Sequence, residues 1–145
     1  FKYVITFDAD GQHRPIDAYN MLKLAKKKKV KAVIGTRFKS KIALKEIPFF
    51  KRITLNLAKK YERFFYGIKL SDAHNGLRVL ERELVKNYIL PIKNSDMNHA
   101  TEISSKICNS TLKFIEYPVI VKYVGKKSQS PLNAINILVN NIFYH

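Results

Sequence analysis

Two aspartates near the start of the chain have the type and spacing that suit divalent-metal chemistry. Asp8 and Asp10 directly follow the run Lys2–Phe7 and are separated by one residue. Like charges this close repel each other, so a bound cation gives a better reason than folding to keep both ionised. Alternate residues of an extended segment face one side, so both carboxylates, with Gln12 after them, can face one ion. Such oxygen ligands favour Mg²⁺ or Mn²⁺, with substrate phosphates completing the coordination.

Two other interpretations of this acidic pair stay open from the residues alone. One is an Asp-Gly turn with solvated carboxylates, although a strand followed by residues 8–13 (DADGQH) is more specific than a lone turn. The other is a class of phosphatases that carries Asp-x-Asp after its first strand, with Thr or Val two places after the second Asp. Gln12 occupies that place here, and no later strand ends in the paired acids that the phosphatase metal requires.

The elements around the pair predict an α/β fold. β-Branched and aromatic residues make Lys2–Phe7 and Lys31–Gly35 buried strands. Pro15 suits the first turn of a helix, and the lysines at 26–29 suit its last turn, where they complement the helix dipole. Strand, helix and strand form a βαβ unit, which predicts a mostly parallel sheet flanked by helices. Ligands of such sheets bind at the carboxyl ends of the strands, where the acidic pair falls.

The rest of the chain continues the alternation. Lys39–Pro48 is expected to be a basic loop, and Ser71–Gly76 a turn. Further helices are predicted over Phe49–Tyr66, Glu81–Tyr88, Met97–Cys108 and Pro131–Tyr144, and strands over Leu77–Leu80 and Leu112–Tyr123, the last interrupted by Pro118. The apolar residues of the helix 49–66 share one face: Phe50, Ile53, Leu57, Tyr61 and Phe64.

Composition narrows the classes of partner. The 145 residues suit one domain or part of one, and the 46% of hydrophobic residues exclude wholesale disorder. Lys and Arg number 27 against 11 acidic residues, a net charge of +16 that attracts phosphorylated ligands, polyanions or anionic membranes. Cys108 is the one cysteine, so no internal disulfide forms and a cytoplasmic location is expected. A non-catalytic basic module for nucleic acid or another polyanion is the alternative function, although no nucleic-acid motif is present.

Six collinear segments resemble family-two glycosyltransferases, the inverting enzymes with the Rossmann-like GT-A fold. They are FDADGQHRP (7–15), AVIGTR (32–37), PFFKR (48–52), SDAHNGLRVLER (71–82), FIEYPVIVKY (114–123) and KSQSPLNAINIL (127–138). Each segment alone is short, but the ordered set is specific and covers nearly the whole chain. The branch that it resembles includes the dolichyl- and polyprenyl-phosphate glycosyltransferases.

The resemblance implies transfer of a sugar, with inversion, from a nucleotide-diphosphate sugar that binds with Mg²⁺ or Mn²⁺. It implies that Asp8 contacts the ribose or the metal, that Asp10 binds the metal and takes part in catalysis, and that Gln12 is a third ligand. Arg37 and Arg52 would hold phosphates by forked hydrogen bonds.

The resemblance also implies roles for the segment of residues 71–82. Asp72 would touch the sugar or the acceptor, and Asn75 would form a tight turn. Arg78 would lock the loop through a salt bridge. His13 and His74 are expected to be solvated or hydrogen-bonding residues and not metal ligands.

The general base departs from the family pattern, because Ala100 stands where many relatives carry an aspartate. Glu102 or His99 then substitutes, or no base is needed. A polyprenyl-phosphate acceptor needs none, since its phosphate is already ionised at pH 7; a growing glycan is the other acceptor considered.

The family's opening half, with its first strand and its base-binding acids, has no counterpart here. We therefore expect residues 1–145 to form a partial catalytic domain. Its positive charge, which favours anionic lipids, predicts that it works at the cytoplasmic face of a membrane.

Overall fold

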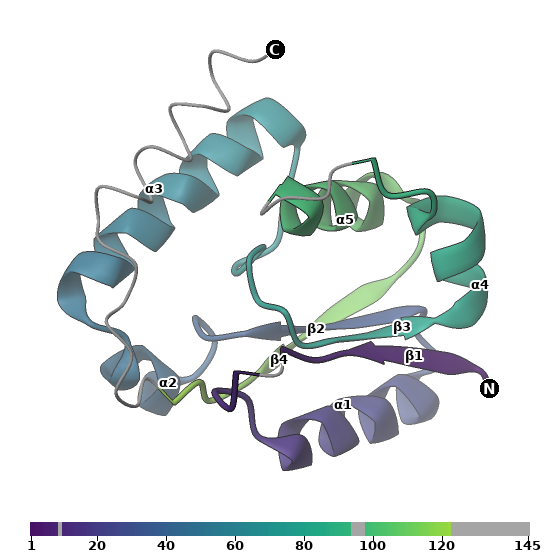
Figure 1. Cartoon of the computed structure of the whole chain (residues 1–145), viewed down its shortest axis with the longest axis horizontal. Coiled ribbons are helices and arrows are strands. Elements are labelled where there is room, and N and C mark those ends of the chain that lie inside the picture. Colours follow the sequence, from purple (N-terminus) through teal and green to yellow (C-terminus); the bar gives the residue numbers. More distant parts are fainter. Residues whose placement is uncertain (9, 94–97, 123–145) are drawn as a thin grey trace.

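The computed structural model describes residues 1–8, 10–93 and 98–122, which form a four-stranded sheet with helices on both faces (Figure 1). The strands are β1 (Tyr3–Thr6), β2 (Ala32–Thr36), β3 (Arg78–Glu81) and β4 (Phe114–Pro118). The helices are α1 (Pro15–Lys28), α2 (Lys41–Glu46), α3 (Phe49–Tyr66), α4 (Arg82–Leu84), which continues as the wider turn η1 (Val85–Ile89), and α5 (Asn98–Asn109). The predicted α/β fold is confirmed.

The described strands lie in the order β1-β3-β2-β4. β2 pairs with β4 in parallel, whereas β3 pairs antiparallel with both β1 and β2. β1, β2 and β4 therefore run in one direction, as the βαβ pattern predicts. Two of the three pairings are nevertheless antiparallel, because the crossover through α1 separates β1 from β2 and β3 inserts between them. Sequence periodicity carries no information about this insertion.

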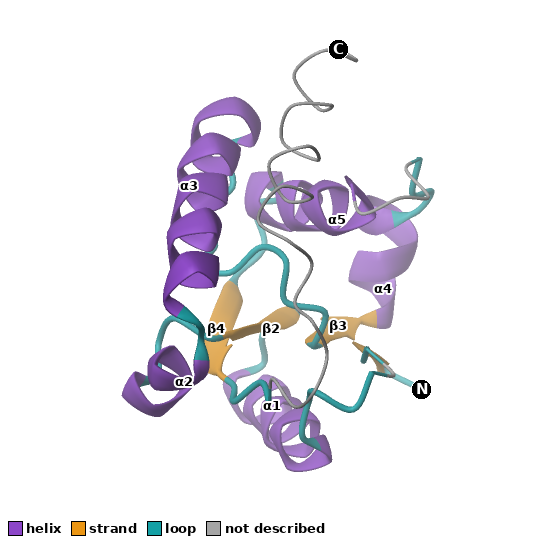
Figure 2. Cartoon of the chain, turned by 60° about the vertical axis from the view of Figure 1, so that its left-hand side comes forward, coloured by secondary structure: helices purple, strands orange, loops and turns teal. Residues whose placement is uncertain are grey.

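The core has one layer on each face of the sheet. Successive strand residues point to opposite faces, so Val33 packs with Met21 of α1, whereas Ile34 packs with Ile107 of α5. In Figure 1, α1 accordingly covers one face, and α4 and α5 cover the other. Figure 2 shows α3 standing beside these layers and not on the sheet.

One predicted loop is a helix. Lys39–Pro48, expected to be irregular, contains α2, and Ser40 explains the difference. The Ser40 hydroxyl accepts a hydrogen bond from the backbone N–H of Ala43 at 3.2 Å and so caps the first turn. The helix stops before Pro48, because the residue preceding a proline avoids the helical conformation.

The remaining elements lie close to their predicted positions. α3 has the predicted bounds, and Gly67 ends it with a positive φ of 66°. α5 begins at Asn98, and β4 ends at Pro118. The predicted helix Pro131–Tyr144 lies outside the described residues. In the part of the chain that the structure describes, no helix combines the length and apolarity needed to cross a membrane.

Candidate active site

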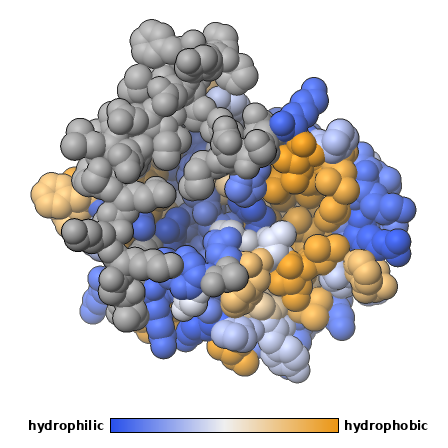
Figure 3. Space-filling view, viewed as in Figure 1, coloured by the Kyte–Doolittle hydropathy of each residue, from blue (hydrophilic) through white to orange (hydrophobic). Residues whose placement is uncertain are grey.

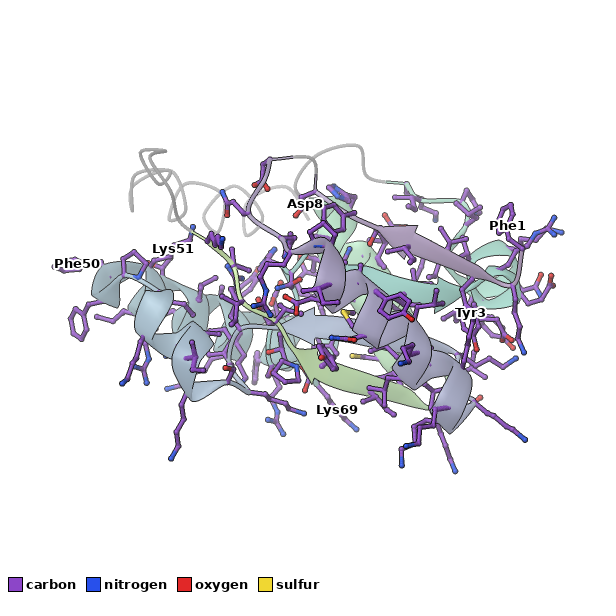
Figure 4. The ribbon with its side chains drawn as sticks, turned by 90° about the horizontal axis from the view of Figure 1, so that it is seen from below. Phe1, Tyr3, Asp8, Phe50, Lys51 and Lys69 are labelled. Atoms are coloured by element: carbon purple, nitrogen blue, oxygen red, sulfur yellow. The ribbon has the colours of Figure 1, made fainter. Side chains whose placement is uncertain are left out.

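Most of the predicted site residues gather at one edge of the sheet. Asp8 follows β1, Arg37 follows β2, and the loop of residues 71–77 leads into β3. β1 and β2 run in the same direction, so their carboxyl ends meet at this edge. Figure 4 shows Asp8 here, with Phe1 and Tyr3 at the opposite end of the sheet.

Arg37 and Asp72 form a buried, forked ion pair. Nη2 and Nε of Arg37 donate to the two carboxylate oxygens of Asp72 at 2.6 and 2.7 Å, and the backbone N–H of Arg37 donates at 3.0 Å. Burial alone would raise the pKa of Asp72, but the hydrogen bonds and charge of Arg37 outweigh it and lower that pKa. The pair therefore fastens the loop 71–77 to the end of β2. The predicted contacts of Arg37 with phosphate and of Asp72 with substrate stay predictions.

Two glycines allow close approaches of this loop to its neighbours. Asn75 accepts a hydrogen bond from the backbone N–H of Leu77 at 3.1 Å, which forms the tight turn expected of it. A Cβ at Gly35 would lie 2.8 Å from that same side-chain oxygen. A Cβ at Gly76 would overlap the carboxylate of Asp8. The loop is therefore seated against β2 on one side and supports Asp8 on the other.

The two aspartates of the opening motif are exposed. The Asp8 side chain is 56% exposed, and its nearest described partner is Nε2 of His13 at 3.6 Å. Asp10 accepts the backbone N–H of Gln12 at 3.0 Å, which is the local turn considered as an alternative to metal binding. Both carboxylates act electrostatically on His13, so the fold brings them to the same imidazole. Gln12 lies beside them, partly buried.

His13 is buried more deeply than the sequence indicates. It is 8% exposed, and its Nδ1 has no hydrogen-bond partner among the described residues. Burial lowers the pKa of His13 and outweighs the opposing effect of Asp8 and Asp10. His13 also forms an isolated antiparallel bridge with Val121, beyond the end of β4, and no local sequence pattern indicates this long-range contact.

Arg78 locks the loop by a route other than the predicted salt bridge. It is 3% exposed, and its Nη2 donates to the backbone carbonyl of Ala73 at 3.0 Å. Its Nε has no hydrogen-bond partner within the described ranges. Burial lowers the pKa of Arg78, while the charges of Asp8 and Asp72 act in the opposite direction. A buried cation therefore lies under the carboxylates of the site.

Lys51, in the first turn of α3, lies in the electrostatic field of the site. Burial and the charge of Arg37 lower the pKa of Lys51, whereas Asp10 and Asp72 act to raise it. Arg52 is exposed on the helix. The predicted contact of Arg52 with phosphate stays a prediction, and Lys51, which is partly buried, is an additional cation near the site that its residue type did not indicate.

Glu102 lies on α5, and its described contacts are with residues close to it in the sequence. Both carboxylate oxygens accept the backbone N–H of Lys93 at 3.1 Å, and Lys106 pairs with it at 2.8 Å. The first of these contacts ties Lys93 to α5, and the second lies within α5. The proposed catalytic role of Glu102 stays a prediction.

Comparison with known families shows to which family the chain belongs. Residues 2–89, more than half of the chain, match the family described as Glycosyl transferase family 2. The chain belongs to glycosyl transferase family 2. The predicted glycosyltransferase is thereby confirmed at the level of the family, whose reaction is sugar transfer from a nucleotide sugar.

Several curated archaeal proteins are similar to this family member. The uncharacterized protein MJ1222 of Methanocaldococcus jannaschii is 30% identical over 92% of the chain and 55% of its own length. A second uncharacterized protein of that organism, MJ0544, is 32% identical over 85% of the chain and 53% of its length. The UDP-N-acetylglucosamine–dolichyl-phosphate N-acetylglucosaminyltransferase of Methanococcus voltae is 31% identical over 57% of the chain and 33% of its length. The chain thus spans about half the length of the uncharacterized relatives that it matches.

The donor set at this edge fits a divalent ion that shares its coordination with a ligand. Within residues 1–8, 10–93 and 98–122, no group of three or more His, Cys, Asp or Glu side chains is placed to hold a metal. Asp8 and Asp10 supply two exposed carboxylates, and Mg²⁺ sites in phosphate-handling enzymes commonly use one or two carboxylates together with substrate phosphates. The residues therefore suit a metal that binds together with a diphosphate.

Proposed function

We propose that the protein transfers a sugar from a nucleotide-diphosphate sugar to a polyprenyl-phosphate acceptor, with inversion and with the help of Mg²⁺ or Mn²⁺ held by Asp8 and Asp10. The observation that supports the metal site is that the carboxylates at this edge differ in burial and in hydrogen bonding. Asp72 is buried and doubly bonded to Arg37, whereas Asp8 is 56% exposed. A metal ligand must be accessible and ionised, and of these two Asp8 meets the first condition.

The remaining residues of the edge would hold the ligand in position. A divalent ion supplies a Lewis acid that neutralises the charge on a departing nucleotide diphosphate. Lys51, whose charge interacts with Asp10, faces the same region and would add a positive charge near the phosphates. Arg37 and Asp72 would keep the loop 71–77 in place under Asp8. Gln12 is the candidate for a third oxygen ligand.

A lipid-phosphate acceptor fits the replacement of the family's general base by Ala100. Ala100 stands at the family position for that base, and the described contacts of Glu102 are to Lys93 and Lys106. A phosphate acceptor is already ionised and nucleophilic at pH 7, so it needs no base. The relative from Methanococcus voltae is named for transfer to dolichyl phosphate, which supports this class of acceptor. Such an acceptor would place the protein at a membrane surface, for which we propose the cytoplasmic face.

The donor site is tested by calorimetric titration of UDP and of GDP with and without Mn²⁺. We expect one nucleotide to bind only with the metal, and Asp10→Asn to weaken that binding at least tenfold. Glu83→Gln, an exposed acid on α4, is the matched control and should bind as the wild type does. Metal-independent binding, or an Asp10→Asn variant that binds normally, would overturn the metal site.

The acceptor is tested by comparing polyprenyl phosphate with the corresponding polyprenol in a transfer assay using a radiolabelled nucleotide sugar. Transfer to the phosphate and not to the alcohol supports the proposal. Equal transfer to the alcohol would show that the site activates a hydroxyl, and a base such as Glu102 or His99 would then be required.

A further inference from the structure

Helix α3 turns its apolar side away from the rest of the described protein. Its exposed large apolar side chains are Phe49 (71%), Phe50 (72%), Ile53 (43%), Leu57 (57%), Phe64 (83%) and Phe65 (62%). At 100° per residue, most of these positions fall on one broad face of the helix. The buried residues of α3 are instead Ala58 and Glu62. A surface helix ordinarily has the opposite arrangement, with its apolar stripe toward the core.

Polar contacts on the inner side fix this orientation. Glu62 is 4% exposed, and Nε2 of His74 lies 2.9 Å from its Oε1. The hydroxyl of Thr101 on α5 donates to the same oxygen at 3.1 Å. Rotating α3 to bury its aromatic face would expose Glu62 and break both contacts. The outward apolar face is therefore a consequence of how the helix is attached.

The charges on the outer side of α3 are all positive: Arg52, Lys59 and Arg63 lie along one border of the apolar face, and Lys60 lies within it. The basic residues of the helix are Lys51, Arg52, Lys59, Lys60 and Arg63. Its one acid is Glu62, which is buried beside His74. The whole chain carries a net charge of +16. A helix with aromatic and aliphatic residues on one face and cations along its borders is typical of segments that lie in the headgroup region of anionic bilayers.

We propose that α3 docks this protein on an anionic phospholipid surface, with its apolar face in the boundary between headgroups and acyl chains. This inference deepens the proposed function, because it gives the element that would bring the site to a lipid-phosphate acceptor. In Figure 4, Phe50 points away from the molecule at the outer end of α3, and Lys51 lies between it and Asp8. The first turn of α3 thus joins the docking face to the edge of the sheet that carries the site.

Another exposed apolar area has a different construction. Figure 3 shows apolar side chains gathered over the part of the surface where β1 and α4 lie. The exposed residues of these elements and the adjoining loop include Ile5, Phe7, Tyr88, Leu90 and Ile92. They come from several segments, whereas the face of α3 belongs to one helix that carries its own cations along one border.

The chain has no tryptophan, so a single introduced tryptophan reports on one place. Phe64→Trp places the probe on the apolar face of α3, where the native ring is 83% exposed. Tyr19→Trp places a matched aromatic probe on α1, where the native ring is 56% exposed. Each variant is titrated with vesicles of phosphatidylcholine alone and with vesicles containing phosphatidylglycerol, with and without brominated acyl chains.

We expect the emission of Phe64→Trp to shift to shorter wavelength and to be quenched by brominated lipid only with phosphatidylglycerol vesicles, while Tyr19→Trp stays unchanged. Leu57→Glu in the Phe64→Trp background should weaken vesicle binding at least tenfold and leave the far-ultraviolet circular dichroism spectrum unchanged.

Three results would overturn the inference. The first is absence of vesicle binding. The second is equal quenching of both probes, which would mean that another surface docks. The third is a Phe64→Trp emission that is already blue-shifted without vesicles and insensitive to them, which would mean that protein covers the face. Calorimetric titration of the Leu57→Glu variant with UDP and Mn²⁺ separates this inference from the proposed function. Loss of vesicle binding with retained nucleotide binding would show that the substitution affects membrane docking by α3 and not the donor site.

Discussion

Two carboxylates at the same edge of the sheet, Asp72 and Asp8, have opposite surroundings. Asp72 is 4% exposed and receives three hydrogen bonds from Arg37, which lower its pKa despite burial. Asp8 has a side chain that is 56% exposed, and its nearest described partner is His13 at 3.6 Å. The hydrogen bonds of Asp72 are thus used within the fold, whereas the carboxylate of Asp8 is held in place and stays accessible to a ligand.

The difference shows that this fold uses one carboxylate to hold the loop 71–77 and leaves another accessible for binding. The same loop does both, because residues 71–77 carry Asp72 into its pair with Arg37 and place Gly76 against the Asp8 carboxylate. Rigid residues packed beneath an exposed metal-binding side chain keep that side chain in position without occupying its lone pairs. The comparison predicts that equivalent substitutions of the two aspartates will have separable effects on stability and on binding.

Asp72→Asn should have the largest effect on stability. The substitution keeps the shape of the side chain but leaves the buried Arg37 without its counter-charge, which typically costs about 3–5 kcal/mol. Urea denaturation followed by circular dichroism measures the free energy of unfolding. Asp17→Asn is the control: Asp17 is also buried and paired, but its partner Arg14 has a side chain that is 37% exposed, so water compensates part of the loss. If the free energy of unfolding falls no more in Asp72→Asn than in Asp17→Asn, Asp72 does not anchor the loop 71–77.

Gly76→Ala should weaken nucleotide binding beyond its effect on stability, because Gly76 supports the Asp8 carboxylate. The new Cβ would overlap the Asp8 carboxylate, which must move, and such overpacking costs about 1–3 kcal/mol. We expect UDP binding in the presence of Mn²⁺ to weaken at least tenfold. Gly67→Ala, at the positive-φ end of α3, should lose stability through backbone strain and keep nucleotide binding. If both variants bind UDP equally well, Gly76 does not position the ligand.

The elements that local pattern determines were predictable, and those that long-range contact determines were not. Periodicity and capping residues predicted α3 with its bounds, because helix signals lie within a few residues of one another. α2 was missed, although Ser40 carries a capping signal, because a helix of six residues is too short to show a clear periodicity. The position of β3 between β1 and β2 depends on pairings across the whole chain, which no local pattern encodes.

The candidate site shows the same division. The type and spacing of Asp8 and Asp10 were sufficient to predict an acidic pair at a strand end, which the structure bears out in position. The pairing of Arg37 with Asp72 joins residues 35 apart, and the sequence gives no register for it. Residue type alone therefore suggested substrate-binding roles for Arg37 and Asp72, and it could not show that the fold pairs them with each other.

Acid should weaken the scaffold through Asp72. Its folded-state pKa lies below the ordinary value of about 3.9, so its stabilising contribution is complete above that value. The contribution is lost as the pH falls from about 4 toward the lower folded-state pKa. We expect the free energy of unfolding to fall less steeply with acidification in Asp72→Asn than in the wild type. Identical slopes in urea titrations between about pH 5 and pH 2 would mean that another group carries the acid sensitivity.

Asp8→Asn should change stability least, within about 0.5 kcal/mol, although it is the same chemical change as Asp72→Asn. The exposed carboxylate loses little on neutralisation, and the amide occupies the same space beside Gly76. One contact works against this expectation, because Asp8 acts electrostatically on the buried Arg78. A loss of about 2 kcal/mol in urea denaturation would show that Asp8 compensates Arg78 and belongs to the scaffold as Asp72 does. A loss within the expected limit, together with loss of metal-dependent UDP binding, would leave Asp8 as a ligand that the fold supports but does not need.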